Sequence, residues 1–217
     1  MRVQAAARQR LRQARPHRAE QAPDAGAAPD AHELRDAVGL LRHHDGDSAG
    51  AETYFIATLQ SGGEQQVLTA ALGGGFQPFL LHGVTGSGKT EVYLRAVQAA
   101  LERGPDAQAL VLVPEINLTP QLQERFVARF GADNVVAMNS GMTPAQRLKS
   151  WLAAHSGTAR IVLGTRMAVF ASIPNLRLIV VDEEHDPSYK QQEGARYSAR
   201  DLAVYRGKLE GAKVLLG

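Results

Sequence analysis

The stretch FLLHGVTGSGKTEVYLRAVQAALERG, residues 79–104, joins a short apolar run, a glycine-rich turn and a helix-like segment. Its central part, Gly83 to Thr90, fits the pattern G-x-x-x-x-G-K-[ST], in which backbone N–H groups surround phosphates. Glycines permit the backbone conformations that this cradle needs, and the following helix directs its positive end at the anion. A flexible loop that matches by chance would not need a strand before it and a helix after it. The stretch therefore predicts a nucleotide site in a parallel α/β fold.

Each residue type in this loop has a predicted role. Lys89 reaches the β- and γ-phosphates of ATP, and the hydroxyl of Thr90 is a ligand for Mg²⁺. The predicted nucleotide-binding residues are Gly83, Val84, Thr85, Gly86, Ser87, Gly88, Lys89 and Thr90.

A second stretch, LRLIVVDEEHD at residues 176–186, places four acidic side chains in five positions after an apolar run. Their repulsion is costly unless a cation lies nearby. We expect Asp182 to hold Mg²⁺ through its water shell and Glu183 to orient and deprotonate the attacking water, so that Lys89, Asp182 and Glu183 are the predicted catalytic residues. The alternative is a solvated acidic strand end.

Apolar runs and helix-like segments alternate regularly after residue 76. The runs lie at residues 79–82, 109–114, 135–138, 160–164, 176–181 and 213–217, and helical periodicity covers residues 90–104, 118–131, 143–157 and 198–211. Short buried strands that alternate with helices predict a mostly parallel sheet with helices on both faces. Ligands of such folds bind at the carboxyl ends of the strands, which is where both motifs fall.

Composition narrows the environment and the partners. The absence of cysteine excludes disulfides and thiolate zinc sites, and no apolar run reaches the length of a membrane span, so we expect a cytosolic protein with no membrane partner. The net charge of +2 is spread evenly, with 8 basic and 7 acidic residues in 1–50 and 16 and 15 in 51–217. Nucleic-acid binding would therefore depend on locally placed groups.

Residues 1–50 differ from the rest of the chain. Alanine and arginine supply 20 of these 50 positions and aromatic residues are absent, so we expect a disordered tail followed by a single domain at residues 51–217. A transit peptide is a second interpretation, but no serine precedes Ser48. Residues 32–44 are expected to form a short helix.

Four blocks in order carry a resemblance to a known family. They are GVTGSGKTEVY from residue 83, LVPEINLTPQL from residue 112, GTRMAVF from residue 164 and DEEHDPSYKQQEGARYSARDLA from residue 182. This series resembles the PriA family, bacterial superfamily 2 helicases of replication restart. The resemblance implies a RecA-like motor domain that uses ATP and Mg²⁺ to move 3′–5′ on single-stranded or forked DNA in the bacterial cytoplasm. It also implies primosome proteins and single-stranded DNA-binding protein as partners.

The resemblance also implies roles for individual residues. Gln65 would read the adenine edge, and His185 would link the nucleotide and DNA sites, unless it is a plain surface histidine. The implied DNA contacts are Thr119, Gln121, Thr165, Arg166, Tyr189, Lys190, Arg196 and Tyr197, with Arg200 as a further charge. Alternatives are a helix cap for Thr119, a carboxylate pair for Arg166 and tyrosines that pack inward.

The chain ends at Gly217, where the family's next motif and second motor lobe would follow. We therefore expect a first motor lobe that binds ATP with little turnover on its own, since arginines of the second lobe are implied to stabilise the transferred phosphoryl group. Two other interpretations remain. One is a non-catalytic nucleotide- or DNA-binding module, and the other is a P-loop kinase, which the LVPEINLTPQL and GTRMAVF blocks disfavour.

Overall fold

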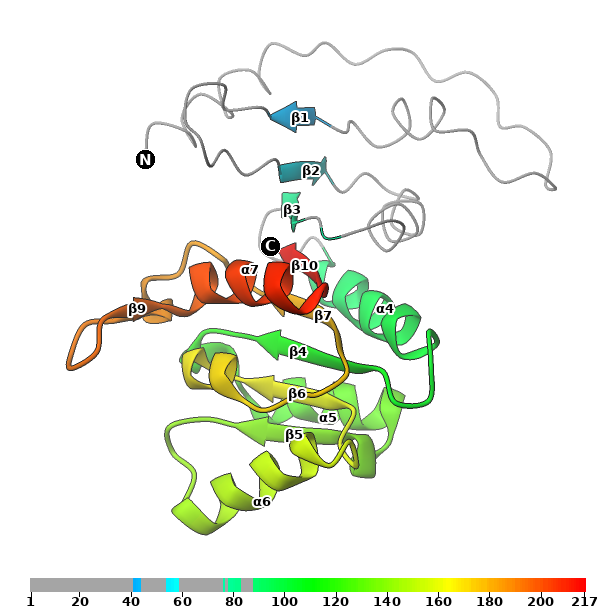
Figure 1. Ribbon diagram of the computed structural model, residues 1–217, viewed down its shortest axis with the longest axis vertical. Helices are drawn as coiled ribbons and strands as arrows, with labels where there is room; N and C mark the ends of the chain where they lie inside the picture. The colour runs from blue at the N-terminus through cyan, green and yellow to red at the C-terminus, as the bar shows by residue number, and fades with distance from the viewer. Residues whose placement is uncertain (1–40, 44–53, 59–75, 77, 83–87) are drawn as a thin grey trace, which may run out of the picture. The chain divides into compact units, whose positions relative to one another are not determined.

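The fold is built on a twisted sheet, seen in a computed structural model that describes residues 41–43, 54–58, 76, 78–82 and 88–217 (Figure 1). In this part of the chain the sheet has the strand order β1-β2-β3-β10-β7-β4-β6-β5. All neighbouring strands are parallel except β1 and β2. The strands are β1 (Leu41–His43), β2 (Tyr54–Thr58), β3 (Pro78–His82), β4 (Gln108–Leu112), β5 (Val135–Met138), β6 (Ile161–Gly164), β7 (Leu176–Val181) and β10 (Lys213–Leu216).

The register of the central strands aligns their carboxyl ends. Val181 at the end of β7 pairs with Leu112 of β4 on one side and with Leu216 of β10 on the other. The next residue of β7's chain, Asp182, donates its N–H to the Leu112 carbonyl at 2.9 Å, and Gly217 donates to the Val181 carbonyl at 2.9 Å. Parallel pairing therefore brings residues from distant parts of the sequence to one edge of the sheet.

In the described part of the chain, four α-helices connect the strands, and their termini carry strong local signals. They are α4 (Lys89–Leu101), α5 (Pro120–Phe130), α6 (Pro144–His155) and α7 (Ala199–Glu210). The hydroxyl of Thr119 accepts a hydrogen bond from the Leu122 N–H, and Thr143 forms a capping box with Gln146. Proline follows each threonine in the first turn, where its missing N–H costs nothing.

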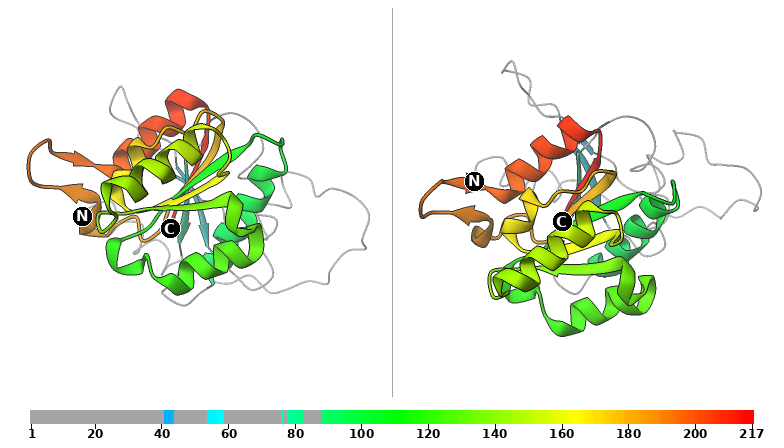
Figure 2. Two further views of the ribbon diagram at one scale, coloured as in Figure 1. Left: turned by 90° about the horizontal axis from the view of Figure 1, so that it is seen from below. Right: turned by 60° about the horizontal axis from the view of Figure 1, so that its bottom comes forward.

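Shorter elements lie between the helices and strands. One-turn 3₁₀ helices are η1 (Glu115–Asn117), η2 (Ala132–Asn134), η3 (Arg166–Phe170) and η4 (Pro187–Tyr189). Strands β8 (Lys190–Gln191) and β9 (Tyr197–Ser198) pair in an antiparallel hairpin that extends away from the main sheet (Figures 1 and 2). In Figure 1 the arrowheads of β4, β5 and β6 point toward the side from which this hairpin extends.

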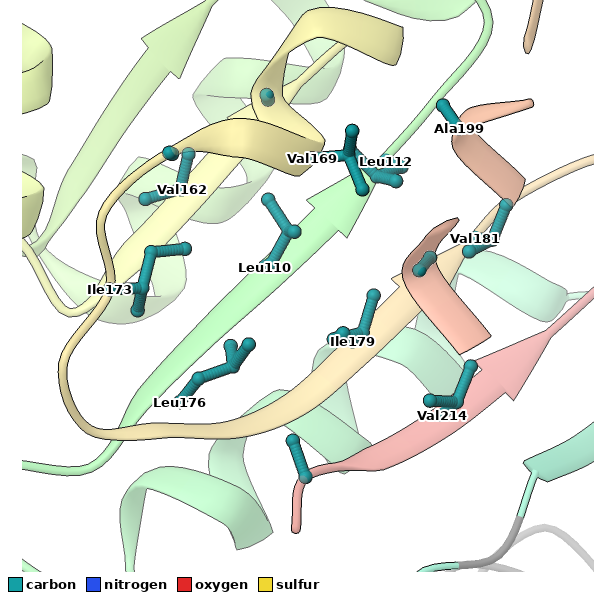
Figure 3. Close-up of a cluster of buried hydrophobic side chains, with 14 of the residues drawn as sticks. Leu110, Leu112, Val162, Val169, Ile173, Leu176, Ile179, Val181, Ala199 and Val214 are labelled. Carbon is teal, nitrogen blue, oxygen red and sulfur yellow. The ribbon is translucent and has the colours of Figure 1, made fainter. Parts of the chain in front are cut away.

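Two hydrophobic cores cover the two faces of the sheet. On one face, Val97 of α4 and Phe126 of α5 pack with alternate strand residues such as Val111. On the other face, side chains of α6, α7 and η3 pack with the intervening strand residues, as Leu110, Ile179 and Val214 illustrate (Figure 3). Strand side chains alternate between the two faces of the sheet, and both faces are buried. The sequences of the strands are therefore unbroken apolar runs.

The expected α/β class with a mostly parallel sheet and helices on both faces is confirmed, and the expected strands and helices are found within a few residues of their expected limits. One expectation is wrong: residues 41–43, assigned to a helix in a disordered tail, form β1 and pair with residues 54–56. Gly39 weakens a helix in this segment, and the strand partner is not visible from local sequence. The rest of the expected tail, residues 1–40 and 44–50, lies outside the described residues.

The described residues all belong to one compact unit, residues 31–217. Within them, no helix has the length and apolar character that crossing a membrane would require.

Candidate functional site

The last three residues of the phosphate-loop motif, Gly88 to Thr90, form the start of α4. Gly88 is the N-cap of this helix and has a φ of +87°, a conformation that favours glycine. Lys89 and Thr90 then form the first turn, whose N–H groups lack partners within the helix. Gly83 to Ser87 and Gln65 lie outside the described residues, so their predicted contacts with nucleotide stay predictions.

The lysine of the loop meets the predicted catalytic glutamate. Lys89 Nζ lies 3.1 Å from Glu183 Oε1, and the two side chains are 10 % and 22 % exposed. The residues are 94 positions apart in the chain. This ion pair brings together two of the residues that the sequence assigned to one site.

Glu183 has an unusual backbone and a second neighbour. Its φ of +47° makes it the one non-glycine residue with positive φ in the described part of the chain. Such conformations cost about 1–2 kcal/mol and cluster at functional sites. Its other oxygen, Oε2, lies 3.6 Å from His185 Nε2, and the His185 side chain is 63 % exposed. His185 therefore contacts the glutamate on one side and solvent on the other, and its coupling role stays a prediction.

Asp182 is held by two buried tyrosines. The Tyr93 hydroxyl donates to Asp182 Oδ1 at 3.0 Å, and the Tyr189 hydroxyl donates to the Asp182 carbonyl at 2.7 Å. Burial raises the pKa of Asp182, and Glu183 adds to this effect, whereas the Tyr93 hydrogen bond and the charge of Lys89 oppose it. Burial and the nearby carboxylates raise the pKa of both tyrosines, so both stay protonated donors.

The residues at this edge fit an Mg²⁺ ion with nucleotide phosphates. Asp182 Oδ1 accepts from the Tyr93 hydroxyl, the backbone N–H of Glu183 also interacts with this carboxyl group, and a half-buried carboxylate is suited to the water shell of a hard cation. Thr90 is half-buried one residue after Lys89. Sequence reasoning missed Tyr93, although a tyrosine on the buried face of the helix after a phosphate loop signals a hydroxyl that needs a partner.

The block LVPEINLTPQL forms η1 and the start of α5. Thr119 accepts the N-cap hydrogen bond from Leu122 N at 3.3 Å, so the capping alternative is satisfied, and Gln121 is exposed in the first turn. Glu115 Oε1 accepts a hydrogen bond from Ser140 Oγ at 3.1 Å, which joins η1 to the turn after β5. The DNA contacts of Thr119 and Gln121 stay predictions.

In the block GTRMAVF, the threonine is buried. Thr165 is 1 % exposed and its hydroxyl has no hydrogen-bond partner among the described residues, so the side chain is enclosed by protein in this structure and its expected contact with DNA stays a prediction. Burial follows from the packing of η3 on the sheet, since Ala168 and Val169 of that helix lie in the core. Arg166 Nη1 donates to the Ser188 carbonyl at 3.2 Å, so it supports η4, and no carboxylate pair is found for it among the described residues.

The hairpin block divides its aromatic residues between core and surface. Tyr189 is 1 % exposed, so its expected role as a stacking platform is wrong, and the inward-packing alternative holds for it. Tyr197 is half-buried and meets the exposed Phe170 edge-on, with ring centroids 5.0 Å apart. Lys190 and Arg196 are exposed and line, with Tyr197, a pocket of about 460 Å³.

Arg200 does not extend toward solvent as a free charge. Its Nε lies 3.2 Å from Glu184 Oε2 and its Nη1 lies 2.8 Å from Asp201 Oδ1. The guanidinium ties the acidic segment to the start of α7, and the expectation that Arg200 offers charge to DNA stays a prediction. The residue has the length and planar geometry for such a pair of contacts.

The chain was compared with known protein families, and the result agrees with the nucleotide site described above. The sequence model of the DEAD/DEAH box helicases matches residues 62–215. The chain belongs to the DEAD/DEAH box helicase family. The matched region includes the phosphate loop, the GTRMAVF block, the acidic strand end and the hairpin.

Curated relatives of this helicase chain are replication restart proteins PriA, which confirms the resemblance found in the motifs. Identity is 48 % over 139 residues with that of Bacillus subtilis, covering 64 % of this chain and 17 % of the relative. It is 50 % over 143 residues with that of Haemophilus influenzae, covering 66 % and 19 %. With that of Rickettsia prowazekii it is 41 % over 165 residues, covering 76 % and 25 %. The chain therefore spans from about a sixth to a quarter of the length of these relatives.

Solved structures share the fold of this DEAD/DEAH box helicase. The DUF1998 helicase MrfA bound to DNA has a TM-score of 0.51 at 20 % identity, covering 70 % of this chain and 23 % of that one. This likeness supports the RecA-like fold alone.

Proposed function

We propose that this chain is the ATP-binding motor domain of a PriA-type 3′–5′ DNA helicase that acts in replication restart. It couples ATP hydrolysis to movement along single-stranded DNA. The observation that carries the proposal is the meeting of Lys89 and Glu183 at 3.1 Å, next to Asp182, at the carboxyl edge of a parallel sheet. The replication restart proteins PriA at 48–50 % identity support the proposal.

The lysine and the glutamate have to separate before hydrolysis. Lys89 is the cation that would neutralise the β- and γ-phosphates, and in this structure its charge is taken by Glu183. When Lys89 turns to phosphate, Glu183 Oε1 loses its partner and becomes free to accept a proton from water. Exchange of one ion pair for another thus prepares the base at the moment when substrate is bound.

Asp182 and the Thr90 hydroxyl would hold Mg²⁺ in this site. When bound, the ion would neutralise charge that develops on the phosphate oxygens. Asp182 suits this task because its backbone and its carboxylate oxygen Oδ1 are held by hydrogen bonds, so that Oδ2 would face the ion.

We propose that DNA lies across the same edge of the sheet. The exposed Gln121, Lys190 and Arg196 supply polar and positive groups, and Phe170 with Tyr197 supplies an aromatic surface. Thr119 adds the amino end of α5 for a backbone phosphate. Forked DNA, primosome proteins, single-stranded DNA-binding protein and a bacterial cytoplasmic location belong to the same proposal.

A second candidate is a nucleotide- and DNA-binding module without turnover of its own. The Lys89–Glu183 ion pair favours this candidate if it persists when ATP binds, because Glu183 could then not accept a proton from water. ATP hydrolysis with and without single-stranded DNA decides between them, with Lys89→Ala and Glu183→Gln as controls. DNA-stimulated turnover that both changes abolish supports the motor, and ATP binding without turnover supports the module. ATP binding that Lys89→Ala leaves unchanged would contradict both.

A further inference from the structure

Tyr93 occupies a position between the phosphate-loop helix and the acidic strand end. It lies on α4, one turn after Thr90, and its side chain is 3 % exposed. Its hydroxyl donates to Asp182 Oδ1 at 3.0 Å. A phenylalanine would fill the same apolar space on the buried face of the helix, so the hydroxyl needs an explanation beyond packing.

The end of β10 leaves room for this hydroxyl. A Cβ atom added at Gly217 would overlap Tyr93 Oη and would lie 3.1 Å from Tyr93 Cζ. The backbone of Gly217 cannot retreat freely, because its N–H donates to the Val181 carbonyl at 2.9 Å and its carbonyl accepts from the Glu184 N–H at 2.7 Å. Three elements, α4, β7 and β10, thus enclose one hydroxyl beside one carboxylate.

Among the described residues, Tyr93 supplies the side-chain hydrogen bond to the carboxylate of Asp182, and the backbone N–H of Glu183 is a second, local donor to it. The Asp182 N–H bonds to the Leu112 carbonyl, and its own carbonyl accepts from Tyr189, so both of these bonds hold the backbone. Without the Tyr93 hydrogen bond the carboxylate would keep the local backbone N–H of Glu183 but would lose the contact that ties Oδ1 to α4. A partner that orients a metal-binding group in this way commonly changes metal affinity by about 10–100-fold.

We propose that Tyr93 is a positioning residue that holds Oδ1 of Asp182 and thereby directs Oδ2 toward the Mg²⁺ that accompanies ATP. This inference rests on the proposed function of the same site. It adds a residue to the Mg²⁺ machinery that lies outside the G-x-x-x-x-G-K-[ST] pattern and outside the acidic motif. It also gives Gly217 a role, as the residue whose missing side chain admits the hydroxyl.

The test is calorimetric binding of ATP to the full chain, with Mg²⁺ in excess and with EDTA, for the wild type and Tyr93→Phe. We expect Tyr93→Phe to weaken binding with Mg²⁺ by about threefold to tenfold, because Asp182 acts through the water shell and the effect lies at the lower end for such partners. Binding in EDTA should be unchanged. Equal loss in both conditions, or no loss in either, would overturn the inference.

Two further variants separate positioning from packing. Val97→Ala removes two methyl groups one turn along α4 in the same core and touches no polar group of the site, so it should lower the unfolding midpoint and leave Mg²⁺-dependent ATP affinity unchanged. In an Asp182→Asn background, Tyr93→Phe should have no further effect on that affinity. A further loss in that background would show that Tyr93 does not act through Asp182.

The same measurement distinguishes the two levels of proposal. Wild-type chain that binds ATP equally with Mg²⁺ and with EDTA, or not at all, would contradict the proposed function itself. Wild-type binding that depends on Mg²⁺, with Tyr93→Phe equal to wild type, would leave the function standing and remove the positioning role alone.

Discussion

Lys89 Nζ lies 3.1 Å from Glu183 Oε1, so the two charges that act on phosphate and on water neutralise each other in this structure. The ammonium group of Lys89 occupies the carboxylate oxygen that would accept a proton from water. The carboxylate of Glu183 occupies the ammonium group that would bind phosphate. Any ligand that binds Lys89 must first break this pair. The pair therefore links nucleotide binding to the release of the base.

Glu183→Gln should separate binding from chemistry. The amide removes the charge that competes for Lys89, and a partly exposed ion pair contributes about 0.2–1 kcal/mol, so ATP affinity should stay equal or rise by up to about fivefold. Turnover should fall by about 10²–10⁴-fold because the base is lost. Lys89→Ala, the control, should lose ATP binding in the same calorimetric assay. Weaker ATP binding by Glu183→Gln would contradict the exchange of partners.

Arg160→Lys should destabilise the fold from a site far from the acidic cluster. Arg160 lies just before β6, and its guanidinium donates to the carbonyls of Leu101, Gly104 and Ala107 at 2.7, 2.6 and 3.1 Å. These hydrogen bonds satisfy backbone carbonyls at the carboxyl end of α4 and in the turn that follows it. The last turn of α4 contains no basic residue that could do so. Lysine cannot reach three carbonyls at once, so the free energy of unfolding should fall by about 1–3 kcal/mol.

Urea unfolding measures this loss. The matched control is Arg177→Lys on β7, whose side chain is exposed, and it should change the free energy of unfolding by less than about 0.5 kcal/mol. Equal midpoints for the two variants would show that the Arg160 hydrogen bonds add nothing.

Gln108→Met should leave buried polar groups without partners. Gln108 is fully buried, its Nε2 donates to the Ala154 and Ala159 carbonyls at 2.7 and 3.0 Å, and its Oε1 accepts from the Asn175 N–H at 3.1 Å. Methionine has a similar volume and no matching donors or acceptors. The free energy of unfolding should fall by at least about 2 kcal/mol.

Thermal and urea unfolding of Gln108→Met, beside Gln98→Met on the exposed face of α4, provide the comparison. The exposed change should stay within about 0.5 kcal/mol. Similar stability of the two variants would mean that water replaces the lost hydrogen bonds at residue 108.

Glu91 should give the protein part of its sensitivity to acid. The hydrogen bond from Arg95, aided by Arg129 of α5, holds the pKa of this carboxyl below its ordinary value of 4.5. A carboxyl with a depressed pKa in the folded state adds stability above its ordinary pKa, and this is lost as the pH falls through the folded value. Because the side chain is 41 % exposed, solvent screening limits the effect to about 0.2–1 kcal/mol.

Glu91→Gln should therefore be less stable than wild type at neutral pH, and the difference should vanish as the pH falls well below 4.5. Urea midpoints measured across this range test the sign. A difference that grows on acidification would contradict the assigned cause.

Local pattern was sufficient for most of the fold. Strand β7 was expected at residues 176–181 and β5 at 135–138, and both have those limits, because unbroken apolar runs between turn residues admit few other structures. Thr119 and Thr143 each precede proline, and both cap their helices, because an N-cap depends on a few neighbouring residues. The sequence also predicted that Lys89 and the acidic strand end lie at one edge of the sheet, since carboxyl ends of parallel strands share that edge, but it did not predict their direct ion pair.

Tertiary structure decided what depends on partners far along the chain. Tyr189 and Thr165 looked available in the sequence, and packing of η3 and η4 on the sheet buries both. Arg200 looked like a free charge, and the approach of α7 to the acidic segment pairs it with Glu184. The sequence by itself determined which residue types reach the edge of the sheet. Only the fold decided which of their atoms face each other, because side-chain direction depends on contacts that no local pattern records.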